Sequence, residues 1–245
     1  MLKGKTALIT GASRGIGRAI AIKFAENKTF VGINYNTDEL GAKQTLKIIK
    51  EKTADGIILK GDVSNKNDVE KIVKTFIHKT KNIDILVNNA GIYEREKFEN
   101  ISLENWNKVI SVNLTGCFNL CKEALPYMKP GGKIIFISSQ LALKGSTHGA
   151  HYAASKAGII GLARSLALEL AYKKINVNAI TPGTIDTNII ANYTEEERQK
   201  RIKEIPLKRL GTPEDVANVC LFLASDLSSY INGETINVNG GLYIQ

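Results

Sequence analysis

The stretch Lys5-Thr6-Ala7-Leu8-Ile9-Thr10-Gly11-Ala12-Ser13-Arg14-Gly15-Ile16-Gly17 decides the fold of this chain. It joins a short apolar run, typical of a buried strand, to a glycine-rich turn and then to apolar residues at helical spacing. Such a turn places a phosphate at a helix N-terminus, and its glycines let the backbone approach that ligand. A plain tight turn needs one glycine rather than three, so the pattern favours dinucleotide binding. The residues expected at the cofactor are Gly11, Ser13, Arg14, Gly15, Ile16 and Gly17.

Strand-like and helical segments alternate from this turn to the end of the 245-residue chain. The alternation predicts an α/β fold of the Rossmann type, a doubly wound parallel sheet of seven strands with helices on both faces. The strands are expected at residues 5–10, 30–34, 56–60, 83–87, 133–138, 175–180 and 234–238. Since no linker or internal repeat divides the sequence, we expect a single domain at 1–245, with a cofactor half at about 1–132 and a catalytic and substrate half at about 133–245. The charged segment at about 185–210 is expected to be a lid-like excursion.

The composition excludes several other classes of protein. Hydrophobic residues make up 43% of the chain and charged residues 23%, which are ordinary globular values. No apolar run is long enough for a membrane span and no signal segment is visible, so we expect a cytoplasmic protein without membrane contact. The formal net charge is +9, but the Lys and Arg residues are scattered over several expected helices with Asp and Glu among them. Because they form no continuous basic stripe, no nucleic-acid partner is expected. Cys117, Cys121 and Cys220 lack metal-ligand spacing and are expected to be buried free thiols, so no metal site is predicted.

The end of the second expected strand bears on the choice of cofactor. NAD-binding units usually place an acidic residue there for the ribose 2′-hydroxyl, whereas this chain has Asn36 and Thr37. Asp38 follows, and it is expected to cap the next helix. A 2′-phosphate would meet no repulsion; Arg14 could pair with it, and Asn36 and Thr37 could donate hydrogen bonds. NADP(H) is therefore the preferred cofactor, and NAD(H) stays open as the alternative.

Polar turns follow two further expected strands. Asp62, which precedes Val63, could accept a hydrogen bond from an adenine amino group or cap a helix, although Ser64 or Asn65 suits the cap better. Asn88-Asn89-Ala90-Gly91 lies where open α/β sheets bind ligands. From the pattern alone, a ligand role for Asn89, Ala90 and Gly91 and a plain polar turn explain this motif equally well.

Tyr152-Ala-Ala-Ser-Lys156 places a phenol and an ammonium group on one face of an expected helix. A nearby positive charge favours phenolate, and a phenol of lowered pKa could exchange a proton with an alcohol oxygen. The pair alone is a weak signal, because this spacing is common on helix surfaces. Asn113 interrupts helical sequence, where it marks either a surface position or a functional kink.

Together these motifs resemble those of the classical short-chain dehydrogenases/reductases, over essentially the whole chain. The matching motifs are Thr10-Gly11-x-x-x-Gly15-Ile16-Gly17, Asn88-Asn89-Ala90-Gly91, Asn113, Ser139, Tyr152-x-x-x-Lys156 and Pro182-Gly183. The resemblance implies that Tyr152 is the catalytic acid/base and that Ser139 hydrogen-bonds the reacting oxygen. It implies that Lys156 binds the nicotinamide ribose and lowers the Tyr152 pKa, and that Asn113 holds a water of a proton relay. Cofactor contacts are likewise implied for Asp62, Val63, Asn89, Ala90, Gly91, Tyr152, Lys156, Pro182, Gly183 and Ile185.

Within that family, the chain is most similar to the 3-oxoacyl-[acyl-carrier-protein] reductases of fatty acid biosynthesis. Asn34-Tyr35-Asn36 and the ending Asn237 to Tyr243 carry this similarity, whereas 129–133 is closer to sugar and polyol dehydrogenases. The resemblance implies a homotetramer that reduces a small or carrier-bound carbonyl with NADP(H). Lys173 and Lys174 could meet an acidic carrier. A sugar or polyol dehydrogenase is the enzyme alternative, and a nucleotide sensor without turnover is disfavoured because it needs no proton relay.

Overall fold

The central sheet of this chain has the strand order β3-β2-β1-β4-β5-β6-β7, and each adjacent pair of strands is parallel. The structure is a computed structural model, and it describes residues 1–52, 54–187 and 193–244. Within these ranges the strands are β1 (Thr6–Ile9), β2 (Phe30–Tyr35), β3 (Gly56–Lys60), β4 (Ile83–Asn88), β5 (Met128–Ile137), β6 (Asn176–Pro182) and β7 (Thr235–Val238). The expected seven-stranded, Rossmann-type parallel sheet is confirmed.

The order of the strands reverses beside β1, and this reversal separates the loops that follow β1 and β4. From β1 the chain moves outward through β2 to β3 and then returns to β4 on the other side of β1. Ile9 pairs with Ile33 on one side and with Val87 on the other, so the carboxyl ends of β1, β2 and β4 are level. Open α/β sheets bind ligands at such a switch point, because the loops diverge there.

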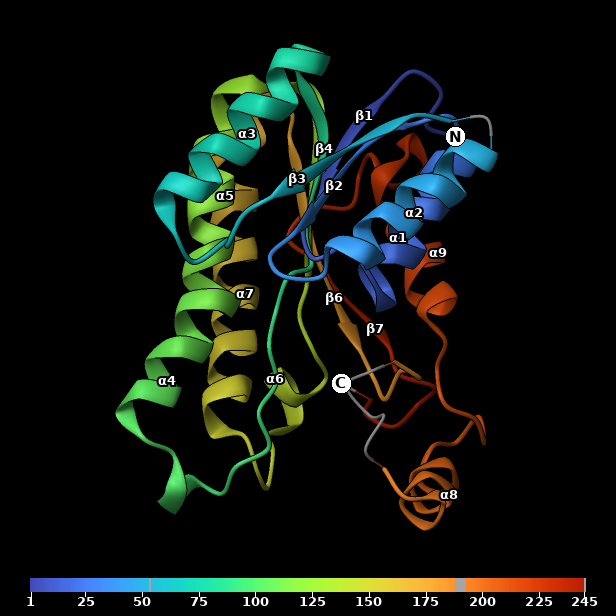
Figure 1. The fold of residues 1–245 in the computed structure, drawn as a ribbon. Helices are drawn as coiled ribbons and strands as arrows, with labels where there is room; N and C mark the ends of the chain where they lie inside the picture. The colour runs from blue at the N-terminus through green and yellow to red at the C-terminus, as the bar shows by residue number, and fades with distance from the viewer. Residues whose placement is uncertain (53, 188–192, 245) are drawn as a thin grey trace.

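Helices cover both faces of the sheet (Figure 1). One layer holds α1 (Gly15–Glu26), α2 (Glu39–Glu51) and α9 (Pro213–Ala224), and the other holds α3 (Lys66–Thr80), α5 (Gly116–Ala124) and α7 (Ala150–Glu169). Shorter helices lie toward the lower end in Figure 1, namely α4 (Leu103–Ile110), α6 (Leu141–Lys144) and α8 (Glu195–Glu204). None of the helices in the described ranges combines the length and apolarity that a membrane-spanning segment requires.

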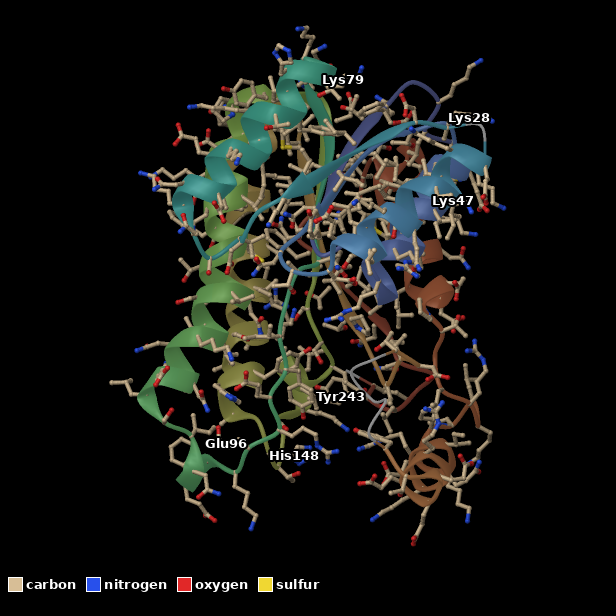
Figure 2. All side chains as sticks on the ribbon, in the orientation of Figure 1. Lys28, Lys47, Lys79, Glu96, His148 and Tyr243 are labelled. Carbon is tan, nitrogen blue, oxygen red and sulfur yellow. The ribbon has the colours of Figure 1, made fainter. Side chains whose placement is uncertain are left out.

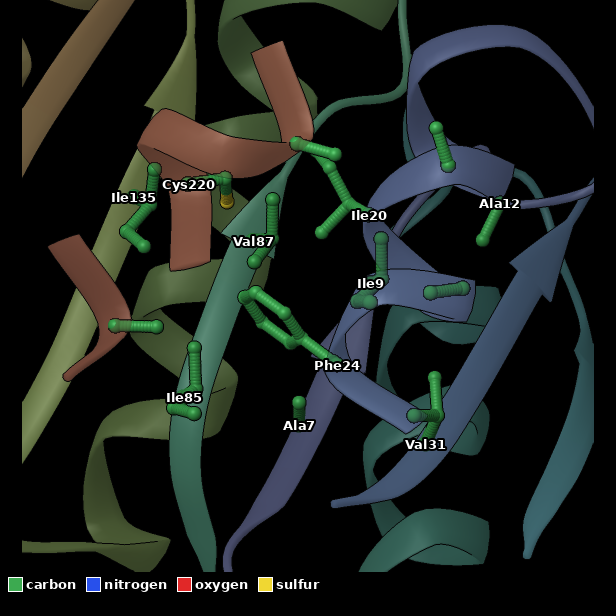
Figure 3. Close-up of a cluster of buried hydrophobic side chains, with 14 of the residues drawn as sticks. Ala7, Ile9, Ala12, Ile20, Phe24, Val31, Ile85, Val87, Ile135 and Cys220 are labelled. Atoms are coloured by element: carbon green, nitrogen blue, oxygen red, sulfur yellow. The ribbon is translucent and has the colours of Figure 1, made fainter. Parts of the chain in front are cut away.

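Successive side chains of β1 point to opposite faces of the sheet, so this one strand contributes to both hydrophobic cores. Ala7 and Ile9 point into the cluster beneath α1 and α9, where Phe24 is fully buried, whereas Leu8 points into the opposite cluster. Figure 3 shows the first of these clusters. Burying an aliphatic or aromatic side chain contributes about 1.5–3 kcal/mol. Because both faces of the strand are buried, its sequence is a continuous apolar run rather than an alternating one.

Two strand boundaries differ from those expected. β5 begins at Met128 rather than at residue 133, because Met128 pairs with Ile83 before a register irregularity leads to the Ile85–Lys133 pair. β6 continues through Thr181 and Pro182, which pair with β7, in place of the turn expected after Ile180. Part of the expected excursion at 185–210 forms α8, while residues 188–192 lie outside the described ranges.

Candidate active site

The glycine-rich turn forms an anion site at the start of α1. Gly11 and Gly15 have φ values of 61° and 56°, a left-handed conformation that favours glycine. A Cβ on Gly17 would lie 2.3 Å from the Gly11 carbonyl oxygen, so no side chain fits there. The fully described helix α1 has no acidic residue in its first turn, and Arg14 at the N-cap makes no side-chain capping bond. Its N-terminal N–H groups and dipole therefore suit a phosphate.

The end of β2 presents polar groups and leaves no carboxylate free for a ribose. Asp38 caps α2 by accepting a hydrogen bond from the Gly41 N–H at 3.0 Å, as expected. Asn36 donates from Nδ2 to Asp62 Oδ2 at 3.1 Å. Arg14, Asn36 and Thr37 are exposed. This arrangement fits a 2′-phosphate, with the Asn36 amide already shared with Asp62.

The Asp62 carboxylate is largely occupied by the loop that contains it. Its Oδ1 atom accepts from the Ser64 backbone N–H at 2.8 Å and from the Ser64 hydroxyl at 2.7 Å. Asn65, one of the two expected caps, is the residue that caps α3. Val63 is buried, and a Cβ on Gly116 would lie 2.8 Å from its Cγ2 atom, so this loop packs closely on α5.

Asn89 ties the end of β4 to the glycine-rich turn. Its Nδ2 atom donates to the carbonyl oxygens of Thr10 at 2.8 Å and Gly11 at 3.1 Å. The Thr10 hydroxyl accepts from the backbone N–H groups of Asn89 and Ala90, both at 3.0 Å. A Cβ on Gly91 would lie 3.4 Å from Lys156 Nζ, so the backbone passes close to that lysine. These hydrogen bonds hold the loop after β4 against the glycine-rich turn, and both loops are candidates for binding the cofactor.

Asn113 occupies a kink in the helix and not a surface position. It is fully buried within a π-helical turn, Ser111–Thr115, between α4 and α5. Its Oδ1 atom accepts from the Ile92 N–H at 2.8 Å, and its Nδ2 atom donates to the Ile92 carbonyl and the Ser155 hydroxyl, both at 3.0 Å. Its own carbonyl accepts from the Cys117 thiol at 3.1 Å. The π-turn is typical of functional segments.

The two serines at the end of β5 have different partners. The Ser138 hydroxyl donates to the Lys156 carbonyl at 2.7 Å on the buried side of α7. The Ser139 hydroxyl accepts from the Leu141 N–H at 3.1 Å and lies beside the Tyr152 phenol. Alternation along the strand thus directs Ser139, and not Ser138, toward Tyr152.

Tyr152 and Lys156 share one face of α7, but the expected lowering of the Tyr152 pKa is wrong for this structure. Burial raises that pKa to about 12, and the neighbouring Ser139 hydroxyl opposes the shift. Lys156 Nζ lies 5.7 Å from the centroid of the Tyr152 ring and donates to the Ile137 carbonyl at 2.8 Å. Burial lowers the Lys156 pKa to about 8. Burial is the largest cause of the raised Tyr152 pKa, and the Lys156 ammonium, which donates to a backbone carbonyl, is not among the groups that shift it.

The residues after β6 lie over the glycine-rich turn. Gly183 donates its N–H to the Val238 carbonyl at 2.9 Å, next to Pro182 at the end of β6. Ile185 is buried and forms an isolated bridge with Gly211. A Cβ on Gly15 would lie 3.6 Å from Cγ2 of Thr187, so this segment reaches the start of α1.

Two further aromatic residues lie at the site, and the first of them, Tyr93, was not found from the sequence. The Tyr93 and Tyr152 ring centroids are 4.4 Å apart, and the Tyr93 hydroxyl donates to the His148 carbonyl at 3.2 Å. The signal available was the position of Tyr93, two residues after the Asn-Asn-Ala-Gly motif. His151 precedes Tyr152 directly, a position from which the sequence allowed either a substrate contact or an exposed loop residue, and the structure excludes the exposed position. The side chain is fully buried at the start of α7, and neither ring nitrogen has a hydrogen-bond partner among the described residues.

The assembled groups suit proton transfer to a developing alkoxide. The hydroxyls of Ser139 and Tyr152 lie together beyond the carboxyl end of β5, with the Lys156 ammonium close to the phenol. Two donors directed at one oxygen stabilise negative charge there, and one of them can give up its proton. No group of three or more His, Cys, Asp or Glu side chains that could hold a metal ion occurs within the described ranges, and the three cysteines are buried and free.

Comparisons with known proteins point to one family. A family model described as enoyl-(acyl carrier protein) reductase matches residues 11–243. A Staphylococcus aureus protein named 3-oxoacyl-[acyl-carrier-protein] reductase FabG is 40% identical over 242 residues, covering 98% of this chain and 98% of the relative. An Aquifex aeolicus protein of the same name is 44% identical over 247 residues, covering 99% and 98%.

Two solved structures that are similar to this chain are likewise described as short-chain dehydrogenases. A short-chain dehydrogenase/reductase from Brucella melitensis, described as a glucose/ribitol dehydrogenase, has a TM-score of 0.94 at 36% identity and covers 100% of this chain and 98% of its own. A short-chain dehydrogenase from Burkholderia cenocepacia, in complex with NADP, has a TM-score of 0.94 at 30% identity and covers 98% of each chain.

Proposed function

Because this chain belongs to the short-chain dehydrogenase/reductase family, we propose that it is an NADP(H)-dependent reductase of 3-oxoacyl thioesters carried on acyl carrier protein. The observation that carries the proposal is the meeting of the Ser139 and Tyr152 hydroxyls beside Lys156. The two relatives named above, similar over almost their whole length, support the choice of substrate.

The proposed roles follow from these positions. NADPH, when bound, supplies the hydride to the ketone carbon. The hydroxyls of Ser139 and Tyr152 donate hydrogen bonds to the ketone oxygen, and the phenol gives its proton to the alkoxide. The positive charge of Lys156 favours the phenolate that remains. Asn113 is proposed to hold a water of the relay through which the phenol regains its proton from solvent.

The residues proposed to hold NADP(H) come from the loops at the carboxyl edge of the sheet. The start of α1 suits the diphosphate, and Arg14 with Asn36 and Thr37 suits the 2′-phosphate. The remaining proposed contacts are Gly11, Ser13, Gly15, Ile16, Gly17, Asp62, Val63, Asn89, Ala90, Gly91, Tyr152, Lys156, Pro182, Gly183 and Ile185.

We further propose a cytoplasmic homotetramer in which α5 and α7 pack against a second copy. Phe118 on α5 is 48% exposed, and with Leu162, Leu166 and Leu170 it lines a shallow apolar groove. Exposed apolar surface of this kind suits a protein interface. Analytical ultracentrifugation of wild type and Phe118→Asp tests this; an unchanged assembly would reject the groove as an interface.

An assay of NADPH and NADH oxidation tests the function. The substrates are an acetoacetyl thioester on carrier protein, the same acyl group on a small thiol, and a panel of sugars, polyols and simple ketones. Faster turnover of the carrier-bound thioester with NADPH is expected. Turnover of sugars alone would favour an activity like the one named for the Brucella melitensis protein, and turnover of nothing would favour a sensor.

A further inference from the structure

The Tyr93 ring packs directly against the ring of Tyr152, the residue proposed to give its proton to the substrate. The two ring centroids are 4.4 Å apart, and the ring planes are tilted by 46°. This separation is close to the short end of the range in which aromatic rings attract each other. Tyr93 follows β4, whereas Tyr152 lies in the first turn of α7. The contact therefore joins a loop to the helix that carries the proposed proton donor.

Packing has to set the angle of the Tyr152 ring, because rotation about its Cβ–Cγ bond has broad, twofold minima. The Lys156 ammonium lies 5.7 Å from the ring centroid and is directed at the Ile137 carbonyl, at 2.8 Å, so it does not hold the phenol. The Ser139 hydroxyl meets the phenolic oxygen, which lies on the axis about which the ring turns, so it offers little resistance to rotation. A neighbour resists that rotation from beside the ring, where Tyr93 lies.

Tyr93 is itself held at its hydroxyl and along the edge of its ring. Its hydroxyl donates to the His148 carbonyl at 3.2 Å, and the Ser146 hydroxyl donates to the same carbonyl at 3.0 Å. His148 lies toward the lower end of the molecule in Figure 2, in the loop that leads into α7. A Cβ on Gly149 would lie 2.9 Å from Tyr93 Cε2, so the ring edge lies against the backbone just before that helix. The ring therefore has little room to move away from Tyr152.

The backbone beside Tyr93 is fixed by Asn113. The Asn113 amide bonds the N–H of Ile92 at 2.8 Å and the carbonyl of Ile92 at 3.0 Å, and it donates to the Ser155 hydroxyl at 3.0 Å. Asn113 and Ser155 are fully buried. A buried polar network whose members have their partners is rigid. These bonds fix the position from which the Tyr93 side chain reaches Tyr152.

From these contacts we propose that Tyr93 is a positioning residue, whose ring keeps the Tyr152 phenol at the angle that proton transfer to the ketone oxygen requires. The inference rests on the proposed reductase function and names a residue that acts through Tyr152. Tyr93 acts through its ring, because its hydroxyl is engaged with the His148 carbonyl. A misdirected proton donor slows the chemical step without weakening the binding of the cofactor.

Single-turnover kinetics separate positioning from simple packing. A preformed complex of enzyme and NADPH is mixed with an acetoacetyl thioester, and the loss of NADPH fluorescence gives a rate constant and an amplitude. The rate constant reports the chemical step, and the amplitude reports the fraction of folded, active enzyme. Tyr93→Ala should lower the rate constant about 10–100-fold at unchanged NADPH affinity. Tyr93→Phe keeps the ring and should restore the rate constant to within about twofold of wild type.

Phe30→Ala is the matched control, because it removes one ring of another aromatic pair. The Phe30 and Phe76 ring centroids are 6.2 Å apart, and Phe30 lies at the start of β2, away from the site. This variant should leave the rate constant unchanged, whatever its amplitude. A rate constant for Tyr93→Ala within about twofold of wild type would overturn the proposal, and so would a loss that Tyr93→Phe shares.

Fluorine NMR tests the ring contact without turnover. If wild type reduces no substrate, the proposed function fails, and this spectrum still decides whether Tyr93 orients Tyr152. In protein labelled with 3-fluorotyrosine, the resonance of residue 152 is the one that Tyr152→Phe lacks. Because Tyr93 packs on one side of that ring, wild type and Tyr93→Phe should show one dominant resonance, and Tyr93→Ala several or a broad one. The same pattern in all three proteins would overturn the proposal.

Discussion

The Asn113 side chain forms two hydrogen bonds with the backbone of Ile92, at 2.8 Å to its N–H and 3.0 Å to its carbonyl. The Asn113 amide thereby satisfies the backbone N–H and carbonyl of the segment that follows β4, as a neighbouring strand would. The same amide donates to the Ser155 hydroxyl on α7. One residue in a π-turn therefore connects the loop that carries Tyr93 to the helix that carries Tyr152.

Asn113→Ala should lower the free energy of unfolding by about 2–3 kcal/mol, because it leaves partly buried backbone groups of Ile92 and the buried Ser155 hydroxyl without this partner. Urea unfolding of wild type and variant measures this, and Asn107→Ala on the exposed side of α4 is the matched control. A loss equal to that of the control would show that the two bonds add nothing.

Tyr152→Phe should lower kcat by about 10²–10⁴-fold, because the variant has no phenolic proton to give. Binding of NADPH, followed by its fluorescence, should change little. Tyr93→Phe keeps the ring beside Tyr152 and removes only the hydroxyl, which bonds the His148 carbonyl and lies by the Ser146 side chain, so it should stay near wild-type kcat. Similar rates for Tyr152→Phe and wild type would exclude Tyr152 as the acid.

Arg14→Ala should weaken NADPH about 10–100-fold and NADH only slightly, because a charge-assisted bond to the 2′-phosphate is lost. Dissociation constants for both cofactors measure the difference. Lys47→Ala removes an exposed cation on α2 and is the control. Equal losses for NADPH and NADH would reject Arg14 as the 2′-phosphate ligand.

Lys156→Met should stabilise the protein at pH 7 by about 2 kcal/mol while abolishing turnover. Burial lowers the Lys156 pKa from 10.5 to about 8, and this difference corresponds to roughly 3 kcal/mol. Loss of the hydrogen bond to the Ile137 carbonyl offsets about 1 kcal/mol of this gain in stability.

The sign of the pH dependence follows from proton binding. Between pH 8 and 10.5 the unfolded chain keeps the Lys156 proton and the folded chain releases it, so wild-type stability from this group rises with pH. Below pH 8 both states are protonated and the penalty is constant. The advantage of Lys156→Met should therefore shrink between pH 8 and 10.5; an advantage that grows over this range would contradict the assignment.

Lys173→Glu with Lys174→Glu should raise KM for a carrier-bound substrate and leave a small thioester unchanged, because the carrier is acidic. Both residues follow α7, and Lys174 is exposed. The double substitution Lys79→Glu with Lys81→Glu on α3 and its C-cap makes the same change in charge elsewhere. Equal increases in KM for the carrier-bound substrate and the small thioester would argue against docking of the carrier at Lys173 and Lys174.

The sequence by itself determined the features that depend on neighbours along the chain. The alternation of strands and helices, the glycine-rich turn, the Asp38 cap and the shared face of Tyr152 and Lys156 follow from local periodicity and residue chemistry. Family resemblance pointed to Ser139, and the Ser138 hydroxyl is engaged instead with the Lys156 carbonyl.

Only the tertiary structure decided the features that depend on packing between distant segments. It buried Asn113 and His151 and placed the Tyr93 ring against that of Tyr152. It also reversed the expected shift of the Tyr152 pKa, because desolvation depends on every element packed around a group, whereas spacing along a helix reports only one neighbour.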